Sequence, residues 1–149
     1  MIYLEFYIIK IQNKRNFNIK KNGIINSEIS KVLSYMRHTD TICISDLGLP
    51  CPENVTYIDI SLKMGVPSFI DVVEEVSKDM KIECIVLAEE VKTKNKEIHD
   101  KIVNMFNDIE IKYVSHEDFK NNTSSCKAII RTGEATPYAN IILQSNCIF

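Results

Sequence analysis

Polar side chains that can exchange protons follow several of the apolar runs that are typical of strands in this sequence. The groups are Asp46-Leu47-Gly48, Glu89-Glu90, His116-Glu117 and Arg131-Thr132-Gly133-Glu134, with Tyr138 and Asn140 shortly after the last of them. In open α/β sheets, ligands bind outside the carboxyl ends of the strands. Carboxylates, amides and imidazoles gathered there act as paired hydrogen-bond donors and acceptors, which suits a small ligand rich in hydroxyl groups.

His38, near the end of a predicted helix, is the principal candidate for proton transfer. Opening a cyclic hemiacetal, the ring form of a free sugar, requires one proton delivered to the ring oxygen and one removed from the anomeric hydroxyl. An imidazole, whose ordinary pKa is about 6.5, can do either at neutral pH. The residue types therefore favour acid–base chemistry on a neutral, hydroxyl-rich ligand.

Each of these residues also has a purely structural interpretation. His38 could complement the dipole at the C-terminal end of its helix, and Asp46 could be a simple turn residue. His116 could cap the helix that follows it. Glu89-Glu90 could be a solvated helix start, and Arg131 could form a structural ion pair with Glu134. Tyr138 and Asn140 could simply close the turn after Pro137.

The motifs that the sequence lacks exclude several classes of enzyme. It contains no G-x-G-x-x-G and no G-x-x-x-x-G-K-[ST], so the usual dinucleotide and nucleotide loops are absent. It contains no G-x-S-x-G and no C-x-x-C, and no histidine lies at zinc-ligand spacing from any of its five cysteines. We therefore expect neither a cofactor nor a bound metal.

Length and charge narrow the class further. The chain of 149 residues corresponds to about one domain, and its net charge of −2 provides no basic field for nucleic acid or a membrane surface. The scattered cysteines indicate reduced thiols and a cytoplasmic location. Residues 1–10 are too short an apolar run to span a bilayer. We interpret residues 1–20 as an N-terminal extension, either disordered or an added strand, and residues 21–149 as one domain.

The pattern of apolar residues predicts strands that alternate with amphipathic helices. Strands are expected at 41–45, 55–60, 82–88, 109–114, 128–130 and 140–143. Helices are expected at about 27–38, capped by Asn26 or Ser27, at 69–80 after Ser68, at 96–106 after Asn95, and at 116–121. This alternation predicts a three-layer α/β/α fold with a mainly parallel sheet in a single domain.

Eight short motifs in the same order and spacing give the sequence a specific resemblance. They are Asn26-Ser27-Glu28-Ile29, His38-Thr39-Asp40-Thr41, Asp46-Leu47-Gly48-Leu49-Pro50, Gly65-Val66-Pro67-Ser68-Phe69, Ala88-Glu89-Glu90, Ser115-His116-Glu117, Arg131-Thr132-Gly133-Glu134 and Pro137-Tyr138-Ala139-Asn140. From about Lys21 to Phe149, the chain resembles the D-ribose pyranase branch of the RbsD/FucU sugar-mutarotase family.

The resemblance implies a cofactor-free isomerase that interconverts the pyranose and furanose forms of D-ribose. It implies a proton-donor role for His38 and sugar-contacting roles for Asp46, His116 and the segment Tyr138, Ala139 and Asn140. It also implies a ring-shaped homo-oligomer, commonly a decamer, with sites at subunit boundaries. The alternatives are a fucose-type mutarotase, a non-catalytic sugar-binding partner of a ribose uptake system, and a structural domain whose polar rim is incidental.

The sequence departs from the family pattern beside its main candidate. Arg37 stands where the family usually has glycine, which alters the turn that presents His38 and adds a positive charge next to it. Leu47 replaces a usual alanine, and Ser145-Asn146-Cys147 replaces a usual small-residue ending. These departures bear on the level of activity more than on its kind.

The order of the elements separates two of the candidates. His38 precedes the first strand and Asp46 ends it, so at about 3.3 Å per residue the two lie roughly 20 Å apart within one subunit. The hypothesis that follows is that His38 of one subunit completes the rim formed by Asp46, His116, Tyr138 and Asn140 of a neighbour.

Overall fold

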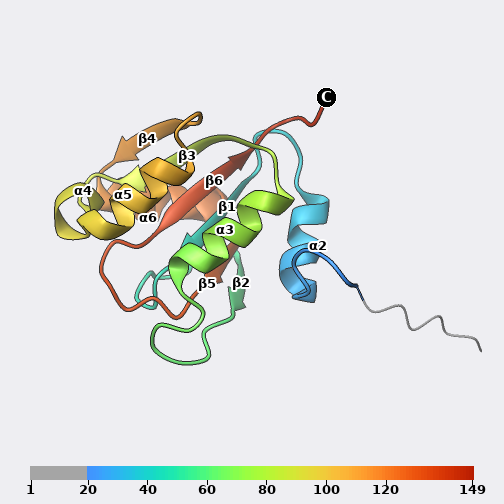
Figure 1. Cartoon of the computed structure of the whole chain (residues 1–149), viewed down its shortest axis with the longest axis horizontal. Helices are drawn as coiled ribbons and strands as arrows, with labels where there is room; N and C mark the ends of the chain where they lie inside the picture. Colours follow the sequence, from blue (N-terminus) through green and yellow to red (C-terminus); the bar gives the residue numbers. More distant parts are fainter. Residues whose placement is uncertain (1–19) are drawn as a thin grey trace, which may run out of the picture.

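The computed structural model describes residues 20–149 of the chain, and the predicted extension 1–20 falls outside this part except for its last residue. The elements follow one another as α2 (Ser27–Tyr35), β1 (Thr41–Ser45), β2 (Thr56–Asp59), α3 (Phe69–Asp79), β3 (Ile82–Ala88), α4 (Val91–Lys94), α5 (Lys96–Met105), β4 (Glu110–Val114), α6 (His116–Asn122), the 3-10 helix η1 (Thr123–Ser125), β5 (Ala128–Arg131) and β6 (Ile141–Ser145). The strands form one sheet in the order β2-β5-β1-β6-β3-β4 (Figure 1).

Five of the six strands run in the same direction, which confirms the prediction of a mainly parallel sheet. β1 and β2 are parallel to β5, and β3 is parallel to β4, whereas β6 is antiparallel to both of its neighbours, β1 and β3. The start of β6 therefore lies at the same edge of the sheet as the carboxyl ends of the other strands. This reversal brings residues 138–140, which precede β6, beside Asp46, which follows β1.

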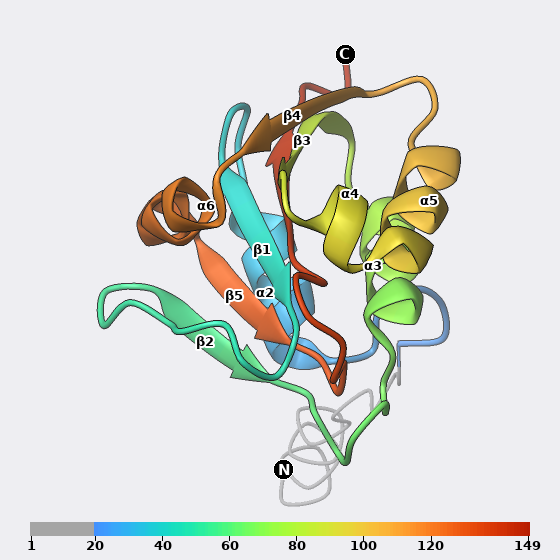
Figure 2. The same ribbon diagram turned by 90° about the vertical axis from the view of Figure 1, so that its left-hand side faces the viewer.

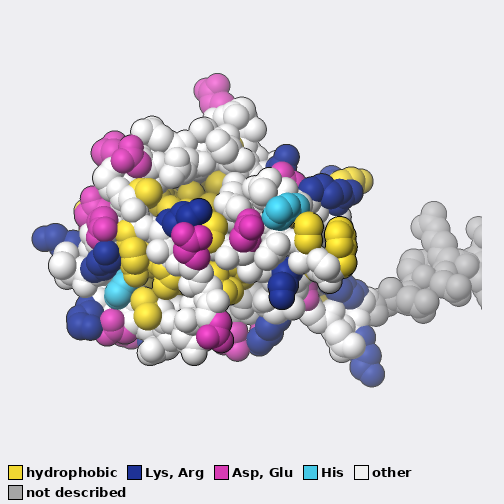
Figure 3. Space-filling model, turned by 90° about the horizontal axis from the view of Figure 1, so that it is seen from above, with side chains coloured by type: hydrophobic (Ala, Val, Ile, Leu, Met, Phe, Trp, Pro, Cys, Tyr) yellow, Lys and Arg dark blue, Asp and Glu magenta, His cyan; other side chains and the backbone are white. Residues whose placement is uncertain are grey.

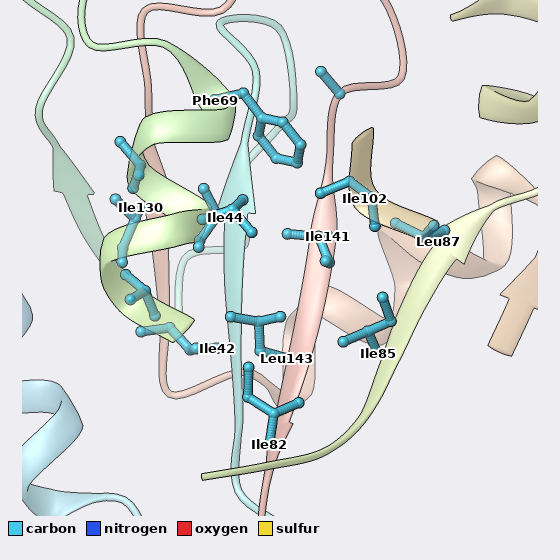
Figure 4. Close-up of a cluster of buried hydrophobic side chains, with 14 of the residues drawn as sticks. Ile42, Ile44, Phe69, Ile82, Ile85, Leu87, Ile102, Ile130, Ile141 and Leu143 are labelled. Atoms are coloured by element: carbon cyan, nitrogen blue, oxygen red, sulfur yellow. The ribbon is translucent and has the colours of Figure 1, made fainter. Parts of the chain in front are cut away.

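Helices cover both faces of the sheet, as the three-layer prediction requires. Figure 2 shows α6 on one side and α3, α4 and α5 on the other. The larger core packs Ile42 and Ile44 of β1 with strand and helix side chains that include the fully buried Phe69 and Ile102 (Figure 4). Cys43, between them, points to the opposite face and belongs to the smaller cluster around Phe119 of α6. The alternation along β1 thus fills two cores at once.

Two predicted helix caps are confirmed. The side chain of Asn26 accepts a hydrogen bond from the backbone N–H of Ile29 at 3.0 Å, and Ser68 Oγ accepts one from that of Asp71 at 3.1 Å. Such caps satisfy N–H groups that have no partner within the helix. Because Ser68 begins α3 and Asn26 begins α2, these caps fix where both helices start on the face of the larger core.

The end of α2 differs from the prediction, and the difference changes the setting of His38. The helix ends at Tyr35 rather than near residue 38, because Met36 takes an extended conformation. Nη1 of Arg37 donates to the carbonyl oxygens of Ser34, Tyr35 and Met36 at 3.0–3.3 Å, which satisfies the end of the helix. His38 therefore lies in a turn after the helix and does not complement its dipole.

Asn95 precedes α5 as predicted but does not cap it with its side chain. Its amide instead donates to Thr136 Oγ1 and to the carbonyl oxygen of Pro137, both at 2.8 Å. The short helix α4, which the sequence pattern did not predict, leads into this residue. Asn95 thus ties the start of α5 to the loop that carries Tyr138.

Candidate active site

A pocket of about 260 Å³ opens at the edge of the sheet where the parallel strands end. Its lining residues are Asp46, Gly48, Leu49, His116, Pro137, Tyr138 and Asn140. The structure therefore brings together four of the five predicted sugar-contacting residues. The fifth, Ala139, is fully buried in the larger core beneath the pocket, so it contributes packing and backbone rather than an exposed side chain.

A reciprocal pair of hydrogen bonds fixes Asp46 and Asn140. Asp46 Oδ2 accepts from Asn140 Nδ2 at 3.0 Å, while Asn140 Oδ1 accepts from the backbone N–H of Asp46, also at 3.0 Å. Asp46 Oδ1 accepts from the backbone N–H groups of Gly48 and Leu49 at 2.9 and 3.0 Å. The carboxylate is thus held in one orientation, with Oδ2 its less occupied oxygen.

The electrostatic setting of Asp46 is a balance of opposing effects. Burial raises the pKa of this carboxyl above its ordinary value, and the hydrogen bonds from Gly48, Asn140 and Leu49, together with nearby His116, reduce that rise. The Asp46 carboxylate has a raised pKa and is held in place by three hydrogen-bond donors. It is therefore suited to binding a ligand from a fixed position.

His116 and Tyr138 form the aromatic side of the pocket. Their rings meet edge to face, with centroids 5.0 Å apart and planes at 89°. Tyr138 has a φ of 58°, in the left-handed region that costs a residue with a side chain about 1–3 kcal/mol. The one other non-glycine residue with positive φ among residues 20–149 is Thr39, next to His38. Backbone strain is therefore found beside both groups of candidates.

Arg131 supports the loop that carries Asp46. Its Nε and Nη2 donate to the carbonyl oxygen of Leu47 at 3.2 and 3.1 Å, and its Nη1 pairs with Asp59 Oδ2 at 3.1 Å. The backbone N–H of Leu47 donates to the carbonyl oxygen of Glu134 at 2.9 Å. The structural ion pair of Arg131 is thus made with Asp59 of β2, and not with Glu134.

His38 lies at the other end of β1, in a second pocket that shares no residue with the first. This pocket, of about 530 Å³, is lined by Leu33, Met36, Arg37, His38, Asp79, Met80, Lys81 and the C-terminal residues Ser145, Asn146, Cys147, Ile148 and Phe149. The structure therefore does not bring His38 together with Asp46 in one chain, which agrees with the separation inferred from the length of the strand.

The imidazole of His38 has a carboxylate beside it. Its Nε2 lies 3.5 Å from Glu83 Oε1, and the side chains are 49% and 37% exposed. Glu83 Oε2 in turn accepts from Gln144 Nε2 at 2.5 Å. A carboxylate that is itself held by an amide can orient an imidazole that exchanges protons with a ligand.

The turn that carries His38 is anchored to the last strand. Ser145 Oγ donates to the carbonyl oxygens of Arg37 and Asp40, and the backbone N–H of Thr39 donates to the carbonyl oxygen of Ser145 at 3.0 Å. Arg37 adds the hydrogen bond from its backbone N–H to Asp40 Oδ2 at 2.8 Å. An arginine is therefore accommodated here, with its guanidinium directed to the end of α2.

Two acidic residues next to the histidines were not identified from the sequence as acting on them. Glu83 is the one charged residue of β3, and its isolation in an apolar strand was the available signal. Glu90 Oε1 accepts a hydrogen bond from the backbone N–H of His116 at 3.2 Å. Its motif was noted, but its contact with His116 depends on the pairing of β3 with β4 and could not be predicted from spacing.

The part of the chain that the structure describes offers no cluster of three or more histidine, cysteine or acidic residues able to hold a metal ion. Within residues 20–149 no helix is both long and apolar enough to cross a membrane. On the face drawn in Figure 3, basic and acidic side chains are interspersed rather than gathered into a basic patch.

Comparison with known proteins identifies close relatives. Residues 19–148 match the profile of the RbsD / FucU transport protein family. The chain is 51% identical over 131 residues to a D-ribose pyranase of Bacillus cytotoxicus, an alignment that covers 88% of this chain and 100% of the relative. A D-ribose pyranase of Halalkalibacterium halodurans is 50% identical over the same shares.

Solved structures agree. Bacillus subtilis RbsD complexed with D-ribose superposes with a TM-score of 0.86 at 48% identity, covering 87% of this chain and 99% of that one. The fucose mutarotase of Streptococcus pneumoniae, solved in complex with L-fucose, has a TM-score of 0.71 at 23% identity and covers 84% of this chain and 95% of its own. This second, more distant likeness shows a shared fold.

Proposed function

The chain belongs to the RbsD/FucU family, and we propose that it catalyses the interconversion of the pyranose and furanose forms of D-ribose. The observation that carries this conclusion is an identity of 50–51% along the whole length of D-ribose pyranases. The pocket at the edge of the sheet supports it, because its carboxylate, amide, imidazole and phenol match the hydroxyl groups of a pentose.

Ring opening is the step that the site has to accelerate. A proton is delivered to the ring oxygen, the bond from that oxygen to the anomeric carbon breaks, and the anomeric hydroxyl loses its proton to give the open-chain aldehyde. A different hydroxyl of the same sugar then attacks the aldehyde, and the protons return. His38 delivers the first proton, while Asp46, His116, Tyr138 and Asn140 hold the hydroxyl groups of the sugar.

Because His38 and the pocket lie at opposite ends of β1, the active site is completed by a neighbouring subunit. His38 of one subunit approaches the pocket of the next. The surface around His38 suits such a contact, since Ile148 and Phe149 line the same pocket and are 87% and 104% exposed. Four further apolar side chains are exposed and favour association into a ring; they are Ile25, Tyr35, Leu62 and Met64. The family resemblance implies a ring that is commonly a decamer.

We place the enzyme in the cytoplasm and give it no cofactor. Its five cysteines are all free, which suits a reducing compartment. The chemistry consists of proton transfers, one ring opening and one ring closure, for which the side chains named above suffice. Residues 21–149 form the catalytic domain, and residues 1–20 are an extension to it.

Exchange spectroscopy tests the function directly. Saturation of a pyranose anomeric proton of D-ribose is expected to transfer to the furanose signals much faster with the protein than without it, and L-fucose is expected to show little effect. Exchange of fucose alone would favour a fucose-type mutarotase. Ribose binding without faster exchange would favour a sugar-binding partner. No binding of either sugar would contradict all three of these functions.

The affinity for D-ribose is expected to fall on acidification. This loss is expected at a higher pH than it would be if the sugar were bound by an exposed aspartate. The carboxylate of Asp46 accepts a sugar hydroxyl, and burial raises the pKa of this group above 3.8. As the pH falls through the raised pKa, the protonated form accumulates and affinity is lost. Calorimetric titration from neutral pH downwards measures this limb. An affinity that stays constant through the whole carboxyl range would contradict the role of Asp46.

A further inference from the structure

Two buried side-chain atoms have no hydrogen-bond partner among residues 20–149, and they belong to two residues that are far apart in sequence but in contact in the fold. They are Glu90 Oε2 and His116 Nδ1. The same two residues are already joined, because the backbone N–H of His116 donates to Glu90 Oε1 at 3.2 Å. Unpartnered buried polar atoms are rare in native proteins. Two of them next to one pocket therefore indicate a functional arrangement.

The two atoms are chemically complementary in one state of the imidazole. A carboxylate oxygen can only accept a hydrogen bond, whereas a ring nitrogen donates one when it carries the proton. One water molecule can accept from Nδ1–H and donate to Glu90 Oε2. The opposite tautomer would turn the lone pair of Nδ1 towards the negative carboxylate of Glu90, and these two acceptors repel each other in a buried site.

The tautomer decides what His116 offers to the pocket. Because Nδ1 is buried, Nε2 is the ring nitrogen that remains for a ligand in the pocket that His116 lines. With the proton on Nδ1, the neutral ring presents a lone pair at Nε2. A lone pair there can accept a sugar hydroxyl. Asp46 has less capacity for this, since its two oxygens already accept three hydrogen bonds from the protein.

We propose that Glu90 is a positioning residue that holds His116 in the Nδ1–H tautomer, so that Nε2 accepts a hydrogen bond from a hydroxyl of the sugar. This inference rests on the proposed function in so far as the pocket binds a sugar. Glu90 acts through His116 and does not itself touch the substrate. Tyr138 keeps the ring in place by its edge-to-face contact.

The test combines a tautomer measurement with exchange kinetics in the full-length, assembled protein. The chain has three histidines, so selective ¹⁵N-histidine labelling with solid-state NMR resolves them whatever the size of the assembly. Glu90→Gln keeps an oxygen for the backbone N–H of His116 but places a donor where Oε2 was. Glu89→Gln is the matched control, because Glu89 is the adjacent residue and its partner is Lys92, at 2.6 Å.

The wild type and Glu89→Gln are expected to show the Nδ1–H form of His116. Glu90→Gln is expected to shift it towards Nε2–H and to slow D-ribose exchange at least tenfold. An Nε2–H form in the wild type, or a Glu90→Gln variant with an unchanged tautomer, would overturn the inference. A shifted tautomer with unchanged exchange would overturn the role of Nε2. Absence of ribose exchange in the wild type would refute the proposed function, while the tautomer would still decide the role of Glu90.

Discussion

Replacing His38 with alanine is expected to lower the protein-catalysed exchange of D-ribose by about 10²–10⁴-fold, the usual contribution of a positioned acid–base group. The substitution removes the imidazole that delivers a proton to the ring oxygen. It leaves the turn in place, because the turn is held by the backbone of residues 37–40 and by Ser145. Saturation-transfer NMR on ribose measures the rate, and light scattering checks that the assembly is intact.

His99→Gln is the matched control for this prediction. His99 lies on α5, its Nε2 is 2.9 Å from the hydroxyl of Tyr113, and it lines neither pocket. We expect the His99→Gln variant to catalyse D-ribose exchange at a rate close to that of the wild type. If His38→Ala retained nearly full activity in an intact assembly, His38 would not be the proton donor.

Changing Asp46 to asparagine is expected to weaken D-ribose binding about 100-fold, because the side chain loses the charge that accepts a sugar hydroxyl and is displaced from its place. The displacement follows because the new amide leaves a donor facing a donor in each orientation, at a cost of about 1–3 kcal/mol. If the new amide nitrogen takes the place of Oδ2, it meets Asn140 Nδ2. Rotating the amide of Asn140 does not help, since its NH₂ would then face the backbone N–H of residue 46. Rotating the new side chain turns its NH₂ towards the N–H groups of Gly48 and Leu49.

Calorimetric titration with D-ribose measures this loss. Asp108→Asn is the control, because Asp108 is an exposed residue in the turn before β4 and the same change of charge there should leave the affinity unaltered. An Asp46→Asn variant that folds and binds ribose as well as the wild type would show that the carboxylate does not contact the sugar.

The fold could be predicted where local pattern decides it. β1 and β3 match the predicted ranges 41–45 and 82–88, since each is an apolar run with polar residues on both sides. The reversal of β6 was not predicted. Its signal was present, because the connection 132–140 is shorter than the crossover of a dozen or more residues that parallel strands need. The early end of α2 depends on side-chain hydrogen bonds from Arg37, which no periodicity of apolar residues reports.

The candidate site was predictable in its residue types and only in part in its arrangement. Asp46 and His116 were found because Asp46 directly follows β1 and His116 lies two residues after the end of β4. The partners that orient the two histidines, Glu83 and Glu90, are contributed by β3 and the residues just after it. Their roles follow from which strands pair, and strand pairing is a property of the whole sheet. Asp59 was missed for the same reason, because its bond to Arg131 requires β2 beside β5.

The sharing of one active site between two subunits is the central claim, and co-assembly of two inactive variants tests it most directly. His38→Ala and Asp46→Asn subunits carry different tags, are co-expressed in equal amounts, and are purified through both tags in turn. A site made of one subunit's His38 and its neighbour's pocket is intact only when the subunit that gives His38 carries Asp46→Asn and the subunit that gives the pocket carries His38→Ala. Random mixing in a closed ring makes about one quarter of the sites intact.

The matched control co-assembles the wild type with the double variant His38→Ala/Asp46→Asn. Shared sites predict about one quarter of full exchange activity in this mixture as well, whereas sites confined to one subunit predict about one half. We expect saturation-transfer NMR on D-ribose to give about one quarter of wild-type activity for both mixtures. No activity in the first mixture together with one half in the second would contradict the shared site.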